Sequence, residues 1–207
     1  MSQKEVWDKI AKPWKTFMIN PVPEVESFLR NKKGNILDMG CGSGRNFFKA
    51  KGIIYGVDFS ENMLRYAKEY ADSLKLDVIL KRAYLDKLPF DANTFDNAIF
   101  ISTLHCIDSE GKRKKTLKEL YRVLKKNGEA MISVWDKEQK IFRNFDKDGY
   151  LSLKDENKEY LRYYYLYDRK EFINLLKESG FKIIKIMDRN NAHGFYSKRN
   201  ILVIVKK

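Results

Sequence analysis

The chain has 207 residues, 43% of them hydrophobic, which suits one domain spanning 1–207 with a well-buried core. No segment approaches the roughly 18 uninterrupted apolar residues of a membrane span, and the N-terminus has no apolar signal region, so we expect a soluble, cytoplasmic protein without a membrane partner. The net charge of +13 favours polyanionic partners such as nucleic acid, although a lysine-rich solvated surface explains the charge equally well.

Cysteine and histidine are too few to organise the fold or a metal centre. The two cysteines, Cys41 and Cys106, make no disulfide framework, and His105 and His193 form no recognisable metal site. We therefore predict neither a disulfide nor a bound metal.

The chain begins with short amphipathic segments. Apolar residues at helical spacing predict a helix over 4–12, which Pro13 should end or bend, and a second helix over 24–30 with proline in its first turn. We expect residues 1–33 to form a helical cap. Such a cap could cover a ligand mouth, but the spacing alone favours plain packing.

A glycine-rich turn follows the first predicted strand, at 35–37. Gly40, Gly42 and Gly44 alternate with other residues there, and a short helix should run from 45 to about 50. An apolar strand that breaks into glycines and opens a helix is typical of a nucleotide-type binding turn, because glycine permits a sharp turn and a close backbone approach. The first N–H groups of that helix would face a carboxylate or phosphate.

Two acidic residues decide which ligand fits this turn. A dinucleotide turn would place its third glycine one residue later, where Arg45 stands. Asp38 ends the first strand, where a carboxylate suits a ligand amine, and Asp58 ends the second predicted strand, 53–58, where such folds hold a ribose diol. An amine, a carboxylate and a ribose describe S-adenosylmethionine better than a nicotinamide dinucleotide. The alternative is that these are ordinary turn glycines.

Strands and helices alternate along most of the rest of the chain. The remaining predicted elements are a helix capped by Ser60, strands at 77–81 and 95–101, a helix over 109–126 ended by Gly128, a strand at 129–135, a helix between Asp168 and Gly180, and strands at 181–187 and 201–205. The polar segment 136–159 lacks periodicity, and we interpret it as a mobile loop within a substrate-side insertion over 136–167.

This alternation predicts an α/β, Rossmann-like fold: a mostly parallel seven-stranded sheet with an antiparallel C-terminal strand and helices on both faces. Ligands bind such sheets at the carboxyl ends of the strands. The candidate cofactor contacts at those ends are Asp38, Gly40, Gly42, Gly44, Asp58, Phe59, Leu85 and Ile101.

The motifs together resemble class I S-adenosylmethionine-dependent methyltransferases over nearly the whole chain. The match is carried by 38–44, Asp58, Leu88-Pro89-Phe90 with Phe95-Asp96, and the helix end at 121–128. The resemblance implies the fold given above and S-adenosylmethionine as cofactor.

Three rarer stretches narrow the resemblance. The segments 7–11 with 21–23, 134–139 and 162–167 are similar to signatures of the tRNA wobble-uridine methyltransferases that esterify 5-carboxymethyluridine. This implies the anticodon loop of a tRNA as substrate and a small zinc-ribbon activator protein as partner, and no role for DNA. The sequence departs from the family pattern at Met18, Val22, Tyr84, Tyr165 and Ile201.

Three residues are candidates for the acceptor side. Because a carboxylate nucleophile is already ionised, the reaction needs positioning rather than a general base, and Arg162 could hold the carboxylate through its planar guanidinium. Its alternative role is a contact at the surface or with a nucleic-acid backbone. His105 would face the acceptor or stay structural, and Tyr163 would stack on a base or pack in the core.

Two other functions stay open. The chain could methylate a small metabolite, because the cofactor motifs are generic, and such an enzyme would bind no tRNA. It could also be a catalytically weak RNA-binding or scaffold protein, which would bind tRNA without methyl transfer. The presence of Gly40, Gly42, Gly44 and Asp58 argues against the hypothesis of a catalytically weak protein.

Overall fold

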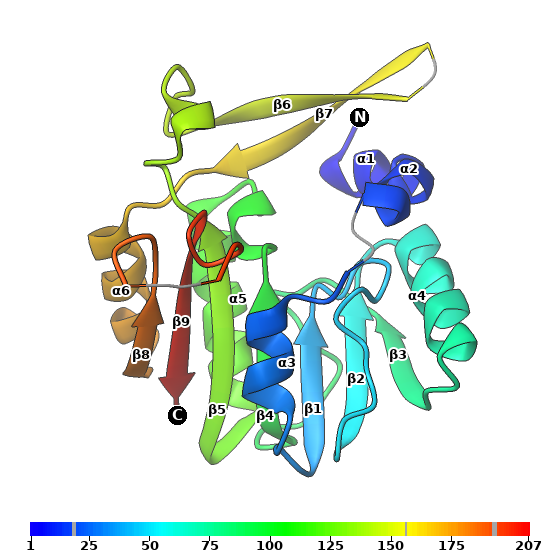
Figure 1. The fold of residues 1–207 in the computed structure, drawn as a ribbon, viewed down its shortest axis with the longest axis vertical. Coiled ribbons are helices and arrows are strands. Elements are labelled where there is room, and N and C mark those ends of the chain that lie inside the picture. Colours follow the sequence, from blue (N-terminus) through cyan, green and yellow to red (C-terminus); the bar gives the residue numbers. More distant parts are fainter. Residues whose placement is uncertain (18–19, 156, 192–193) are drawn as a thin grey trace.

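The computed structural model describes residues 1–17, 20–155, 157–191 and 194–207, so Met18 and His193 lie outside the described residues. Seven strands form one sheet in the order β3-β2-β1-β4-β5-β9-β8 (Figure 1). Their bounds are β1 (Asn35–Met39), β2 (Ile53–Asp58), β3 (Val78–Arg82), β4 (Phe95–Ile101), β5 (Leu124–Trp135), β8 (Lys182–Met187) and β9 (Asn200–Lys206). β1 to β5 pair in parallel, whereas β9 is antiparallel to both β5 and β8. This confirms the predicted Rossmann-like fold.

Helices cover both faces of the sheet. α3 (Pro23–Leu29) and α4 (Glu61–Ser73) pack on the face that carries Ile36 and Ile54. On the opposite face, α5 (Glu110–Val123) and α6 (Arg169–Glu178) pack in one cluster with Leu37 and Phe100. Because neighbouring residues of a strand point to opposite faces, Ile36 and Leu37 serve the two layers. Among the described residues, no helix is long and apolar enough to cross a membrane.

Local capping fixes the starts of three of these helices. The side chains of Ser60, Ser109 and Asp168 accept hydrogen bonds from the backbone N–H three residues later. Each bond satisfies a donor that a helix start leaves free. The caps predicted at Ser60 and Asp168 are thereby confirmed.

The predicted helix over 45–50 is wrong. Residues 45 and 46 form a turn, and 47–50 have no regular structure. The Phe47 N–H donates to the Gly44 carbonyl at 2.8 Å, and the fully buried Phe47 ring packs under α4, whereas Phe48 packs in the cluster under α3. The two rings therefore serve different layers. No helix start offers N–H groups to a ligand here.

The helix predicted over 109–126 ends earlier than expected. α5 stops at Val123, β5 begins at Leu124, and Gly128 lies inside β5 rather than ending the helix. The carbonyls of Arg122 and Val123 accept N–H groups from the turn at Asn93 and Thr94. This tertiary pairing replaces another helical turn.

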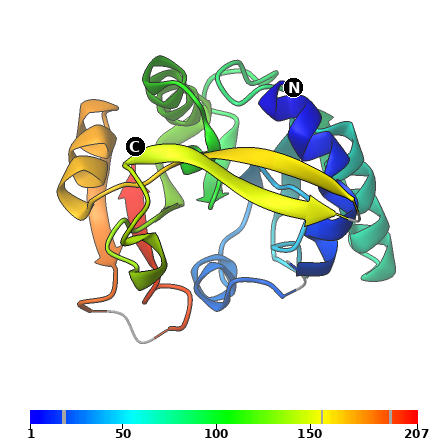
Figure 2. The same cartoon turned by 90° about the horizontal axis from the view of Figure 1, so that it is seen from above.

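The segment expected to be a mobile loop contains a strand. β6 (Asp148–Asp155) pairs antiparallel with β7 (Lys158–Tyr165) as a hairpin separate from the main sheet. No residue of β6 is fully buried, so its sequence shows no clear apolar periodicity. In Figures 1 and 2 the hairpin passes above the carboxyl ends of the central strands.

Two short helices, α1 (Gln3–Lys9) and α2 (Ala11–Phe17), begin the chain. They meet at Ile10, so the helix predicted over 4–12 is interrupted three residues before Pro13 rather than at the proline itself. Pro13 lies in the first turn of α2, where a missing N–H removes no helical bond. Trp7, Ile10 and Ala11 pack with Met63 of α4 and Tyr160 of β7, which places these helices between α4 and the hairpin.

Candidate functional site

A cavity of about 600 Å³ lies at the carboxyl ends of the central strands. Gly40, Asp58 and Ile101 line it from the ends of β1, β2 and β4, and Tyr164 of β7 and Trp7 of α1 line it from the hairpin and the N-terminal helices. This is the edge where parallel sheets bind ligands. The cavity has a half built on the main sheet and a half built under the hairpin.

The glycine turn shapes the first half. Gly40, Gly42 and Gly44 have φ angles of +74°, +53° and +82°, which side chains other than glycine rarely adopt. A Cβ on Gly40 would lie 2.4 Å from Cγ2 of Thr103, and one on Gly44 would meet the Phe47 ring, so both positions serve close packing. A Cβ on Gly42 would meet nothing within 4 Å, and Gly42 lines the cavity, so its open side can receive a ligand.

Asp58 lies beside this turn and lines the cavity. Its Oδ2 accepts the Gly42 N–H at 3.0 Å, and its Oδ1 accepts the Ser60 N–H at 2.9 Å. Burial raises the pKa of Asp58 to about 6, although backbone hydrogen bonds act in the opposite direction. Each oxygen keeps a lone pair for a further donor, which suits the two hydroxyls of a ribose.

Asp38 is the second acidic group of this half. Only 1% of its surface is exposed, and its Oδ2 has no hydrogen-bond partner among the described residues. Burial raises the pKa of Asp38 to about 7, against the nearby charge of Arg45. Asp38 is not among the residues that line the cavity, although Gly40, two residues later, is one of them. A buried carboxylate oxygen without a donor fits a cationic ligand group.

The remaining predicted cofactor contacts form an apolar edge. Phe59, Leu85 and Ile101 all line the cavity. The Phe59 ring meets Tyr84 edge-on, with 5.9 Å between the centroids. An open glycine, two carboxylates and an apolar edge together fit the amino acid, ribose and base of S-adenosylmethionine.

Near-parallel aromatic rings form the half under the hairpin. Trp135 stacks on Tyr164 with 4.4 Å between centroids and 10° between planes, and on His105 at 4.8 Å. Phe142 stacks on the same indole at 5.2 Å. All four line the cavity, so its half under the hairpin is a wall of aromatic side chains. We label this half the acceptor half, and its rings, with Trp14 and Tyr196, the acceptor wall.

His105 is buried and lies in the cavity wall as a neutral group. Burial lowers the pKa of His105 to about 3, and its Nδ1 accepts the Trp135 N–H at 3.3 Å. With Nδ1 as an acceptor, the proton of the neutral ring sits on Nε2, which has no partner among the described residues. His105 is therefore suited to donate a hydrogen bond rather than to take up a proton.

Arg162 lies in β7 and is 9% exposed. Its Nη1 donates to the Tyr164 hydroxyl at 2.8 Å, and the guanidinium carbon lies 5.2 Å from the Trp14 ring centroid. Nε has no hydrogen-bond partner among the described residues. Arg162 itself is not a lining residue, but Trp14 and Tyr164 are, so the guanidinium stands directly behind the acceptor wall.

The structure places Tyr163 away from the cavity. Its hydroxyl donates to Asp148 Oδ2 at 3.0 Å, and its ring meets Tyr150 edge-on across the hairpin. Tyr163 and Arg162 are neighbours in a strand, so their side chains point to opposite faces. Only the face of Arg162 turns to the cavity.

Sequence reasoning missed most of the acceptor wall. Trp14, Phe142 and Tyr196 reach the cavity from the N-terminal helices, the segment before the hairpin and the loop before β9. Trp135 stood in a family-like motif but was given no role. The density of aromatic residues in these segments is a weak signal of a ligand wall. No group of three or more metal-binding side chains occurs among the described residues.

Comparison with known proteins identifies the class of domain. A family model described as a methyltransferase domain matches residues 37–132. The tRNA (carboxymethyluridine(34)-5-O)-methyltransferase of Schizosaccharomyces pombe is 29% identical over 98% of this chain and 95% of its own length. An uncharacterised protein of Methanocaldococcus jannaschii is 32% identical over 87% of this chain and 82% of its own length.

Solved structures show the same fold. A protein of Pyrococcus horikoshii has a TM-score of 0.72 at 23% identity, with 89% of this chain and 87% of the other covered. An S-adenosylmethionine-dependent methyltransferase of Methanosarcina mazei has a TM-score of 0.70 at 20% identity, with 91% and 98% covered.

The chain therefore belongs to the class I S-adenosylmethionine-dependent methyltransferases, and S-adenosylmethionine is its cofactor. Within that class it resembles the tRNA carboxymethyluridine methyltransferases.

Proposed function

We propose that this enzyme methylates the carboxylate of 5-carboxymethyluridine at the wobble position of tRNA. The observation that carries the proposal is the buried Arg162 guanidinium behind the acceptor wall. No carboxylate of the described residues forms an ion pair with it, and its Nε is unpartnered. Because a buried charge without a counter-ion is costly, the site favours an acceptor that brings an anion.

The resemblance to named relatives supports the choice of acceptor. The Schizosaccharomyces pombe relative aligns along nearly the whole chain, including the hairpin that carries Arg162. A carboxylate matches the fork of a guanidinium, and stacked aromatic rings suit a splayed base.

The chain's own residues position the reaction. When bound, S-adenosylmethionine supplies a methyl group on a sulfonium. Asp58 and the Gly42 backbone hold the cofactor, and Asp38 offers its free oxygen to a cationic group. Arg162, behind Trp14 and Tyr164, supplies the positive charge that attracts the acceptor carboxylate. The Nε2 proton of His105 is available to an acceptor oxygen. The acceptor needs no deprotonation, so alignment supplies most of the rate enhancement.

Recognition of tRNA would use the charge at the cavity mouth and a partner protein. Lys4, Lys112 and Arg199 are lining residues, and the whole chain carries a net charge of +13. Cations of this kind attract the phosphate backbone without reading sequence. We also propose a small zinc-ribbon activator protein as partner, on the resemblance to the wobble-uridine family.

The test is transfer of labelled methyl from S-adenosylmethionine to undermodified tRNA, with and without a zinc-ribbon partner, followed by digestion to nucleosides. We expect an alkali-labile methyl ester on the wobble uridine. Cofactor binding without tRNA labelling in either condition would contradict the proposal.

Variants test the role of Arg162 directly. We expect Arg162→Met to lower kcat/KM for tRNA about 100-fold or more, which corresponds to roughly 3 kcal/mol, with cofactor affinity little changed. Arg65→Met is a surface control, because Arg65 also lies over an aromatic ring, Tyr66, but is exposed and has no cavity-lining ring beside it. Equal activity of the two variants would show that Arg162 has no role in binding the acceptor.

A small-molecule acceptor is the second candidate. The observation that favours it is the cover of the cavity by the hairpin and the N-terminal helices, which suits an enclosed ligand. A metabolite methyltransferase would label small carboxylic acids and show no salt-dependent tRNA binding.

A further inference from the structure

Helix α1 lies between α4 and the hairpin and contributes to the lining of the cavity. Figure 2 shows it beside the hairpin at one end and beside α4. Gln3, Lys4 and Trp7 line the cavity from this helix. Its two ends make different polar contacts, one with β7 and one with the start of α4.

At the first end, the Gln3 carboxamide pairs with the edge of β7. Its Nε2 donates to the Leu161 carbonyl at 3.1 Å, and its Oε1 accepts the Tyr163 N–H at 2.9 Å. These two hydrogen bonds take the place of those that a neighbouring strand would form at the free edge of β7. The two bonded residues flank Arg162, so Gln3 fixes the backbone on both sides of the proposed acceptor contact.

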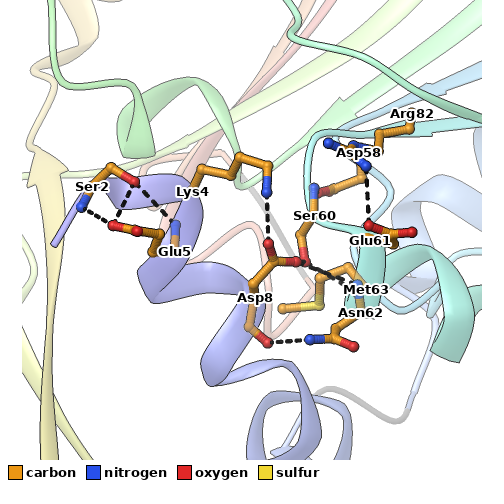
Figure 3. Close-up of polar contacts among 10 residues, drawn as sticks. All are labelled: Ser2, Lys4, Glu5, Asp8, Asp58, Ser60, Glu61, Asn62, Met63 and Arg82. Carbon is orange, nitrogen blue, oxygen red and sulfur yellow. Dashed lines mark hydrogen bonds and ion pairs between the residues drawn. The ribbon is translucent and has the colours of Figure 1, made fainter.

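At the other end, Asp8 is bonded to the residues that follow Asp58 (Figure 3). Its Oδ1 accepts from Ser60 Oγ at 2.6 Å and from the Asn62 N–H at 3.3 Å, and its backbone carbonyl accepts from Asn62 Nδ2. Lys4 Nζ lies 2.8 Å from Asp8 Oδ2. Burial alone would raise the pKa of Asp8, but the hydrogen bonds from Lys4 and Ser60 hold it below its usual value.

Ser60 connects this contact to the cofactor half. The Ser60 N–H donates to Asp58 Oδ1, and its hydroxyl both donates to Asp8 and accepts the Met63 N–H that starts α4. Asp58 and Asp8 are therefore joined through a single residue. Because Ser60 is bonded to both carboxylates, a displacement of the Asp58 carboxylate on ligand binding would also displace Asp8.

We propose that Gln3 and Asp8 are positioning residues that couple the cofactor site to the acceptor site through α1. This rests on the proposed role of Arg162 for its acceptor half. The two residues are five positions apart, about 7.5 Å along a helix, and the capping box of Ser2 and Glu5 stabilises the start of that helix. A stiff spacer of this length transmits displacement from Ser60 to the backbone around Arg162.

The first test measures cofactor binding by calorimetry, without any acceptor. We expect Asp8→Asn to weaken binding at least fivefold, and Gln3→Ala, which touches no residue of the cofactor half, to weaken it at least threefold. Glu5→Gln is the matched control: Glu5 lies on the same helix, its side chain is hydrogen-bonded to Ser2, and glutamine can complete the capping box. A Gln3→Ala affinity equal to that of Glu5→Gln would overturn the coupling.

The second test follows hydrogen exchange of the Tyr163 amide, which donates to Gln3. We expect the cofactor to slow this exchange at least threefold in the native protein and to leave it unchanged in Asp8→Asn. The same slowing in both proteins would overturn the proposal. Melting temperatures of the variants show whether each is folded before either readout is taken.

The kinetic readout separates positioning from a general loss of structure. We expect Gln3→Ala to raise KM for the acceptor more than KM for S-adenosylmethionine, and Asp8→Asn to do the reverse. Failure of tRNA as acceptor would leave the calorimetry and exchange results standing, so the two proposals fail separately. Proportional changes in both KM values for both variants would contradict a positioning role.

Discussion

The two carboxylates of the cofactor half are buried where water cannot solvate their charge. Asp38 and Asp58 are 1% and 7% exposed, and burial raises their pKa values to about 7 and about 6. Their unfolded values lie near 4. The folded chain therefore keeps groups that favour ligand binding at a cost to its own stability.

Replacing Asp38 tests this cost. A raised folded pKa contributes stability that is present below about pH 4 and lost as the pH rises through about 7. At pH 8 we expect Asp38→Asn to raise the free energy of unfolding of the cofactor-free protein, on the order of 1–4 kcal/mol, and to weaken cofactor binding at least tenfold. Thermal melts with and without cofactor measure both effects. A destabilised variant would show that Asp38 is paired in the free protein.

The same carboxylates make cofactor binding depend on pH. The cofactor offers a cation and hydroxyl donors, which pair best with ionised carboxylates, so affinity should fall as the pH drops through about 7 and then about 6. We expect up to a tenfold loss per pH unit for each group. Calorimetry between pH 5 and 8 measures it, and Asp58→Asn should remove the lower inflection. A flat profile would contradict the raised pKa values.

At the scale of elements, the sequence alone was sufficient to predict most strands of the main sheet. Strands β1, β2 and β4 are apolar runs bounded by turn residues. That pattern predicts a strand without any knowledge of how the side chains pack. The hairpin was missed because β6 has no fully buried residue, so the face it turns inward is decided by contacts with distant segments. The helix expected at 45–50 failed for a related reason, because Phe47 and Phe48 pack into separate clusters.

The two halves of the candidate site differ in the same way. The cofactor half comes from one motif and the ends of neighbouring strands, so local sequence indicates it. The acceptor wall joins Trp14, Trp135 and Phe142 from three separate segments, and only the folded chain brings them together. The spacing of these residues along the sequence does not indicate that their side chains lie together in the fold.

The glycine turn is the element most sensitive to a single methyl group. A Cβ on Gly40 would lie 2.4 Å from Thr103 Cγ2, and its φ of +74° is strained for other residues. We expect Gly40→Ala to destabilise the protein by about 1–3 kcal/mol and to weaken cofactor binding. Gly111→Ala is the matched control, because a Cβ there meets only Ser109 Oγ at 3.8 Å. Chemical denaturation of both variants measures the difference, and equal stability would contradict the clash.

For the whole molecule, the cofactor should stabilise the folded chain by mass action. At a free cofactor concentration of 100 times Kd, we expect about 2.7 kcal/mol of added stability, which raises the melting temperature by roughly 5–10 °C for a chain of this size. Asp58→Asn should show less of this shift at the same concentration. A native protein whose melting temperature does not respond would contradict the assignment of the cofactor site.

The hairpin also has a kinetic consequence. It belongs to a two-stranded sheet separate from the main one and passes over the carboxyl ends of the central strands, so we expect it to move when a modified acceptor is released. Where opening is slower than chemistry, the first turnover outpaces all later ones. Rapid-quench measurements should then show a burst of about one product per enzyme. A variant in which the hairpin is held less tightly should show a smaller burst and a faster steady-state rate.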